Sequence, residues 1–75
     1  MNWSDSLQQQ TRDAIAEMRV TPDGLLHMKH KSLGYGSIHW ESLTSKTLVL
    51  HRENAEPDLY FPGADALIEA GWAID

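Results

Sequence analysis

Histidine side chains concentrate in the middle of this chain, where their spacing bears on metal chemistry. All four histidines lie within residues 24–52. His39 and His51 fall on the polar sides of two alternating runs, and a short turn between the runs would bring their rings across from or diagonal to one another. Imidazole suits zinc and nickel ions, so His39 and His51 are candidate ligands of a divalent metal. An exposed strand face that carries ordinary half-polar histidines explains the same pattern.

The other two histidines are less suited to a shared metal ion. His27 and His30 are three residues apart, a spacing that joins two ligands on a helix but separates them onto opposite faces of a strand. The alternating residues around them predict a strand, so this pair is not expected to chelate. All four rings would gain charge between about pH 5 and 7, as any group of histidines does.

Catalytic signatures are missing from the sequence. The chain has no cysteine and no nucleophile elbow, and no two carboxylates have the apolar neighbours that would raise a pKa. The run 34–37, Gly-Tyr-Gly-Ser, lacks the third glycine, the following helix and the lysine of a phosphate-binding loop, and is typical of a hairpin turn. A chain of 75 residues also has little room to enclose a substrate. We therefore expect a protein that is not an enzyme and needs no cofactor.

Charge is distributed unevenly along the chain. The net charge is −5, made up of −2 over residues 1–23, +3 over residues 24–52 and −6 over residues 53–75. The basic middle section suggests a nucleic-acid-binding sheet face as an alternative function, because phosphate binding needs clustered permanent cations. Its candidate residues are Lys29, Lys31, Lys46 and Arg52. Solvated strand residues that protect sheet edges would look the same.

The acidic last third favours a different partner. Glu53, Glu56 and Asp58 precede Tyr60, so negative charge and an aromatic side chain occur together. Such a surface suits a protein partner with a basic surface. The leading functional hypothesis is binding to another protein through this acidic region, through the exposed sheet face, or through both, with these four residues as the candidate binding residues.

Hydrophobic periodicity predicts the elements that would position these residues. Spacing of three and four predicts an amphipathic helix over residues 4–19. Alternation predicts antiparallel strands over 24–31, 37–41 and 47–52, an edge strand over 59–61 and a two-turn helix over 64–70. The expected fold is one α+β domain over residues 1–75, in which both helices cover the apolar face of a three- to four-stranded meander. The apolar face would consist of Leu26, Met28, Ile38, Trp40, Leu48 and Leu50.

Composition limits the setting in which this domain works. No apolar run of about 18 residues occurs, and the first residues lack the features of a signal peptide, so a cytoplasmic location is expected. A short fourth strand would leave a sheet edge open to a homodimer. In size, acidity and helix–sheet–helix plan, the chain resembles the small accessory proteins of bacteria and their phages, anti-CRISPR inhibitors among them. This resemblance covers no specific motif and implies no residue roles.

Overall fold

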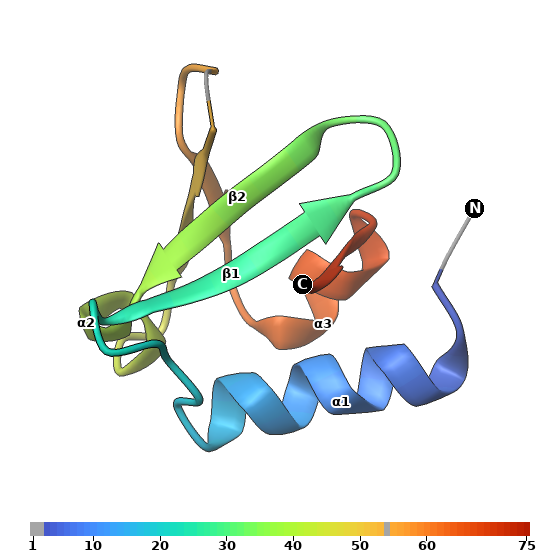
Figure 1. The fold of residues 1–75 in the computed structure, drawn as a ribbon, viewed down its shortest axis with the longest axis horizontal. Helices are drawn as coiled ribbons and strands as arrows, with labels where there is room; N and C mark the ends of the chain where they lie inside the picture. The colour runs from blue at the N-terminus through green and yellow to red at the C-terminus, as the bar shows by residue number, and fades with distance from the viewer. Residues whose placement is uncertain (1–2, 54) are drawn as a thin grey trace.

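A computed structural model describes residues 3–53 and 55–75 of this protein (Figure 1). Met1 and Asn2, and Asn54 of the predicted acidic connector, lie outside the described residues. The elements in chain order are α1 (Asp5–Ala16), β1 (Leu25–His30), β2 (Gly34–His39), α2 (Trp40–Leu43), β3 (Leu48–Arg52), β4 (Leu59–Phe61), α3 (Ala64–Glu69) and β5 (Trp72–Ile74).

The five strands form one antiparallel sheet with the order β4-β3-β2-β1-β5. This arrangement confirms the predicted α+β class and the meander of the first four strands, with β4 at the residues expected for it. The strand β5 was not predicted. Three residues are too short a segment for alternation to be recognised, so this strand depends on its pairing with β1.

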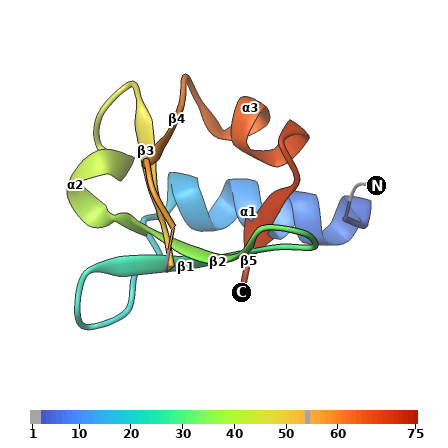
Figure 2. The same ribbon diagram turned by 90° about the horizontal axis from the view of Figure 1, so that it is seen from above.

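The arrangement of the helices on one face of the sheet follows the prediction. Figure 2 shows α1 and α3 on the same side of β1, β2 and β5, while β3 and β4 curl toward the helices. The helices and the sheet enclose one buried cluster, which consists of Ala14, Leu26, Met28, Ile38, Leu48, Leu50, Leu67 and Trp72. No helix of the described residues lies on the opposite face of the sheet. No helix in residues 3–53 and 55–75 has the length and apolarity needed to cross a membrane.

The helix α1 is shorter than its sequence pattern suggests. Its first turn is capped by Ser4, whose Oγ accepts a hydrogen bond from the backbone N–H of Leu7 at 3.2 Å. It ends at Ala16, and Met18 adopts a left-handed conformation with φ 53°. The side chain of Met18 is 36% exposed and lies beyond the helix, whereas the sequence predicts a helix that continues to residue 19.

The prediction of a strand over residues 37–41 is wrong at the C-terminal end of that strand. The strand β2 stops at His39, and α2 begins at Trp40. The reason is local: the Nδ1 of His39 accepts a hydrogen bond from the N–H of Glu41 at 3.3 Å and so caps a helical turn. Trp40 consequently leaves the core-facing row and is 44% exposed, whereas the neighbouring strand residue Leu48 is buried as predicted.

Gly36 also has a role that differs from the predicted one. It was assigned to the hairpin loop, but it lies inside β2 and is buried. A Cβ atom at Gly36 would come within 2.8 Å of the Leu50 side chain and 2.9 Å of the His51 carbonyl oxygen. The glycine is needed because two strands approach each other closely there.

The helix α1 also protects one edge of the sheet. Thr11 is fully buried, and its hydroxyl accepts a hydrogen bond from the backbone N–H of Ile74 at 3.2 Å. The same hydroxyl donates to the carbonyl oxygen of Leu7 at 2.8 Å. The edge at β5 is therefore covered by α1, and β4 forms the opposite edge of the sheet.

Candidate functional site

A row of polar residues crosses the helix-free face of the sheet. Strand pairing places His27 opposite Ser37, and Ser37 opposite His51. Asp75 adjoins His27, because its N–H donates to the His27 carbonyl oxygen at 3.0 Å. At the other end, the Nδ1 of His51 lies 2.8 Å from the Oδ1 of Asp58. The row therefore runs carboxylate, imidazole, hydroxyl, imidazole, carboxylate across the sheet.

A groove of about 450 Å³ lies on this face. Among the described residues, two imidazoles, one hydroxyl, one phenol and two carboxylates line it, and no lysine or arginine does. Its lining residues are Leu25, His27, Met28, Tyr35, Gly36, Ser37, His51, Glu53 and Asp75. A volume of this size lies in the range of small-molecule and side-chain binding sites.

The hydrogen bond to Asp58 fixes the donor and acceptor roles of the two His51 ring nitrogens. A carboxylate only accepts hydrogen bonds when ionised, so the Nδ1–H of His51 donates to Asp58. In the neutral ring, this arrangement leaves Nε2 as a hydrogen-bond acceptor. The pair is partly exposed, with side-chain exposures of 67% for His51 and 38% for Asp58.

The two histidines proposed as metal ligands are engaged separately. The Nδ1 of His39 caps α2 and lies 3.5 Å from the Oε1 of Glu41, whereas His51 pairs with Asp58. Among the described residues, no group of three or more histidine, cysteine, aspartate or glutamate side chains is arranged to hold a metal ion. The structure brings His27 into the same groove as His51 instead.

The sequence did not predict this groove, because the expected turn between the second and third strands differs from the one in the structure. Alternation alone places His27, Ser37 and His51 on the polar side of their strands. A four-residue turn was expected to bring His39 near His51, but the connection between β2 and β3 spans residues 40–47 and includes α2. The observed register sets Ser37 opposite His51. Only this register, together with the distant pairing of Asp75, reveals the row.

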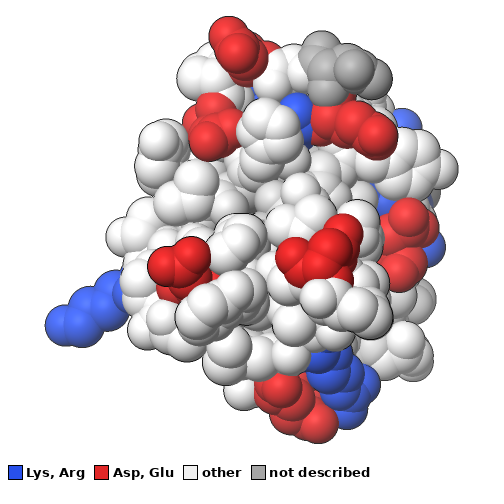
Figure 3. Space-filling view, turned by 60° about the vertical axis from the view of Figure 1, so that its left-hand side comes forward, with Lys and Arg blue, Asp and Glu red and all other residues white. Residues whose placement is uncertain are grey.

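The acidic residues of the leading hypothesis gather at one end of the sheet. Glu53 continues β3 and donates its N–H to the Tyr35 carbonyl oxygen at 2.9 Å, and Glu56 is exposed in the loop that follows. We call Glu53, Glu56 and Asp58 the acidic end. Figure 3 shows acidic side chains gathered in the region of the loop between β3 and β4. Tyr60, on the neighbouring β4, is 66% exposed.

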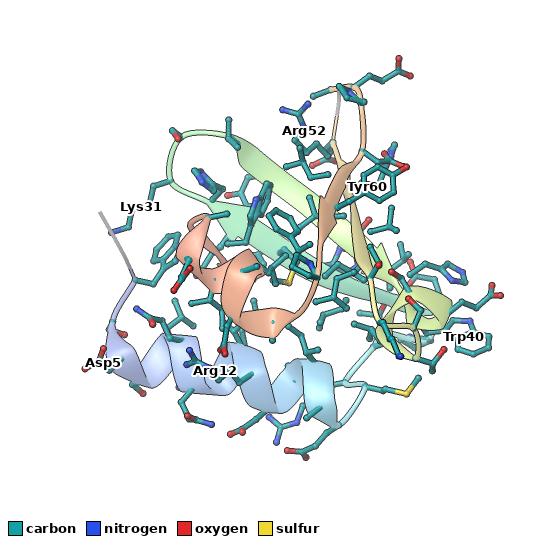
Figure 4. The ribbon with its side chains drawn as sticks, turned by 180° about the vertical axis from the view of Figure 1, so that it is seen from behind. Asp5, Arg12, Lys31, Trp40, Arg52 and Tyr60 are labelled. Carbon is teal, nitrogen blue, oxygen red and sulfur yellow. The ribbon has the colours of Figure 1, made fainter. Side chains whose placement is uncertain are left out.

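One cation lies within the acidic end. The Nη2 of Arg52 donates to the Pro57 carbonyl oxygen at 3.1 Å, which ties the end of β3 to the loop. Its Nε is buried and has no hydrogen-bond partner among the described residues. Figure 4 shows Arg52 and Tyr60 at the same end of the molecule, well separated from Lys31.

The predicted nucleic-acid residues do not form a single patch. The ammonium groups of Lys29 and Lys31 lie 5.2 and 4.7 Å from the centre of the Trp3 ring, in cation–π geometry. Lys46 lies in the connection between α2 and β3, and Arg52 lies at the other end of β3. The four cations thus occupy three separate places.

Comparisons of this chain with protein-family models, with curated proteins and with solved structures find no match. The chemistry of the groove and of the acidic end is therefore the basis for assigning a function.

Proposed function

We propose that this protein is a small non-catalytic module that binds a basic surface of another protein. The observation that carries this proposal is the acidic end, where three carboxylates lie in or next to the connection between β3 and β4, close in the chain to the exposed Tyr60 of β4. Exposed charges of one sign raise the rate of association with a partner of opposite charge and reject partners of like charge. An exposed tyrosine adds the apolar contact that often dominates binding energy at an interface.

The size of the molecule is compatible with such an interaction. A standard protein interface covers about 800 Å² on each partner. The described chain exposes 4694 Å², so an interface of this size would cover about one sixth of its surface. The acidic end and the adjoining sheet face together offer a continuous area for this contact, because Glu53 belongs to both.

The alternative of nucleic-acid binding receives less support. Its four candidate cations are dispersed, and Arg52 lies among carboxylates that would repel phosphate. Titration with generic DNA and RNA at several salt concentrations distinguishes the two functions. Weak binding without a steep salt dependence is expected here, whereas a steep loss of affinity with salt would favour the nucleic-acid alternative.

The central experiment compares two charge-reversed double variants. Glu53→Lys with Glu56→Lys changes the acidic end, and Glu41→Lys with Glu69→Lys makes the same change in net charge at exposed sites elsewhere. Immobilised wild-type protein is used to capture partners from cells, and each variant is then tested against the captured protein. The first variant should lose capture, while the second should keep it. Equal capture by both variants would contradict the proposal.

We also propose, as a second interaction, a homodimer that forms through the sheet edge. The strand β4 pairs with β3 and forms the outer strand of the sheet. Sedimentation over a range of protein concentrations distinguishes a monomer from a dimer. Loss of a dimer after Tyr60→Lys would assign β4 to its interface.

A further inference from the structure

We infer that the groove on the helix-free face binds an arginine side chain supplied by the basic partner. This inference rests on the proposed function and names the chemistry that the partner presents. The groove is defined by its lining residues given above, and it has contributions from β1, β2, β3 and the residue after β5.

The charge of the groove selects a cation. Glu53 and Asp75 line it, and both carry a negative charge at neutral pH. Lys29 projects from the same face, but its ammonium group lies against the Trp3 ring and does not line the groove. A positively charged ligand therefore meets two carboxylates and no lysine or arginine along the lining.

The shape of the lining groups selects a flat cation. The ring of Tyr35 is 56% exposed and lines the groove, together with the imidazoles of His27 and His51. A guanidinium group is planar and weakly hydrated, so it stacks on aromatic rings more readily than an ammonium group does.

The hydrogen-bonding capacity of the groove also matches a guanidinium. This group has five N–H donors and no acceptor. The groove offers the carboxylate oxygens of Glu53 and Asp75, the hydroxyl of Ser37, and the Nε2 of neutral His51, whose Nδ1–H is donated to Asp58. A lysine ammonium has only three donors that diverge from one point, so it would use fewer of these acceptors.

A metal ion is a less suitable occupant. The groove contains two imidazoles and two carboxylates, but these side chains do not converge on a common point within the described chain. Separated acceptors distributed over about 450 Å³ suit an organic cation with several donors better than one ion that needs close ligands.

The test is an NMR titration of the full chain with N-acetyl-arginine amide. The ring signals of His27, His51 and Tyr35 should shift and saturate. N-acetyl-citrulline amide, which has nearly the same shape without the charge, should produce no saturable shift. Nα-acetyl-lysine amide, which keeps its side-chain ammonium group, should bind several-fold more weakly than the arginine compound. Equal shifts with citrulline would overturn the inference, and so would saturating shifts with zinc chloride but none with the arginine compound.

Single variants connect the binding to the groove. Glu53→Gln and Asp75→Asn should each weaken binding of the arginine compound about threefold to fivefold, the usual effect of one partly exposed charge pair. Glu69→Gln is the matched control, because Glu69 is an exposed carboxylate on α3 that does not line the groove, and it should leave binding unchanged. Unchanged binding in both groove variants would overturn the inference.

The inference and the proposed function fail in different ways. If the arginine compound does not bind but the charge reversal at Glu53 and Glu56 still abolishes partner capture, the function stands and the arginine site is wrong. If the arginine compound binds in the groove but the charge reversal leaves partner capture intact, the proposed function is wrong and the partner does not supply the arginine.

Discussion

At the residue scale, His30 shows that a histidine in this chain can have a purely structural role. Its Nε2 lies 2.8 Å from the Ala70 carbonyl oxygen, so Nε2 carries the proton and donates. Its Nδ1 accepts hydrogen bonds from the backbone N–H groups of Ser32 and Leu33, each at 3.1 Å. The ring also contacts Trp72, with 5.1 Å between the ring centres. One side chain thus joins the β1–β2 turn to the end of α3.

Replacement of His30 by alanine should lower the free energy of unfolding by about 2 kcal/mol, because backbone groups in the turn and at Ala70 lose their partner. Urea denaturation measures this change. His27→Ala is the control, since His27 is exposed and should cost less than about 0.5 kcal/mol. Equal effects of the two substitutions would contradict the structural role of His30.

The turn before β1 contains a carboxylate with a shifted pKa. The hydroxyl of Thr21 donates to the carboxylate of Asp23 and, with smaller contributions from backbone N–H groups and from His27, lowers the pKa of Asp23 below its ordinary value of 3.8. Thr21→Val should therefore raise the pKa of Asp23, as an NMR titration of its carboxyl carbon measures.

The lowered pKa also determines how this contact affects stability as pH changes. A carboxylate whose pKa is lower in the folded state contributes stability above its unfolded pKa and loses it as the pH falls through the folded value. The small stability difference between wild type and Thr21→Val should therefore shrink in acid. If the pKa of Asp23 is the same in Thr21→Val as in the wild type, the Thr21 hydroxyl is not the main cause of the lowered pKa.

At the scale of the elements, α1 and β5 depend on one hydroxyl. The fully buried Thr11 joins them through its hydrogen bonds to the Ile74 N–H and the Leu7 carbonyl oxygen. The sequence predicts a helix that includes Thr11, but nothing in the sequence indicates that the Thr11 hydroxyl covers a strand edge.

Thr11→Val should lower the free energy of unfolding by about 1–3 kcal/mol, because it leaves the Ile74 N–H without its partner in a partly buried position. Hydrogen exchange should accelerate at the Ile74 amide more than at amides in β2 and β3. Thr11→Ser keeps the hydroxyl and serves as the control, so it should retain most of the protection at Ile74. If hydrogen exchange at the Ile74 amide is equally fast in Thr11→Val and Thr11→Ser, the Thr11 hydroxyl does not protect the strand edge.

The connection between β2 and β3 shows a second effect at this scale. The Ser42 hydroxyl accepts a hydrogen bond from the Val49 N–H at 2.7 Å and donates to the Thr47 carbonyl oxygen at 3.1 Å. These contacts stabilise α2 in place of a tight turn, and they place Trp40 outside the core. The indole of Trp40 lies over Gly24, where a Cβ atom would come within 2.7 Å of it.

At the scale of the whole molecule, stability depends on a small core. A chain of 75 residues is expected to have a free energy of unfolding of about 4–11 kcal/mol. Leu50 is fully buried in the centre of the apolar cluster. Leu50→Ala should cost about 2–5 kcal/mol and lower the Tm by roughly 10–30 °C, as a thermal denaturation curve measures.

Leu33→Ala is the matched control for the core, because Leu33 is 46% exposed in the β1–β2 turn. It should change the Tm by only a few degrees. A fall in Tm at Leu33 as large as that at Leu50 would show that the stability of the fold does not reside in the cluster between helices and sheet.

The two proposed binding features also belong to this scale. The acidic end and the groove share Glu53, so a basic segment that contacts one lies next to the other. The helices cover the opposite face of the sheet and leave this one available, as Figures 1 and 2 show.

The sequence by itself determined the features that depend on neighbouring residues. Helical spacing indicated α1, and alternation indicated β1 and β3 with buried Leu26 and Leu48. The acidic end was equally visible, because its carboxylates are close together in the chain.

Only the tertiary structure decided which distant residues meet. The pairing of β5 with β1 brings Asp75 to His27, and the register of β2 on β3 brings Ser37 to His51. Strand register is chosen by the packing of whole faces and by the connections between strands, and α2 changed that connection. The groove could not be predicted because its parts become neighbours only when the sheet closes over a shared core.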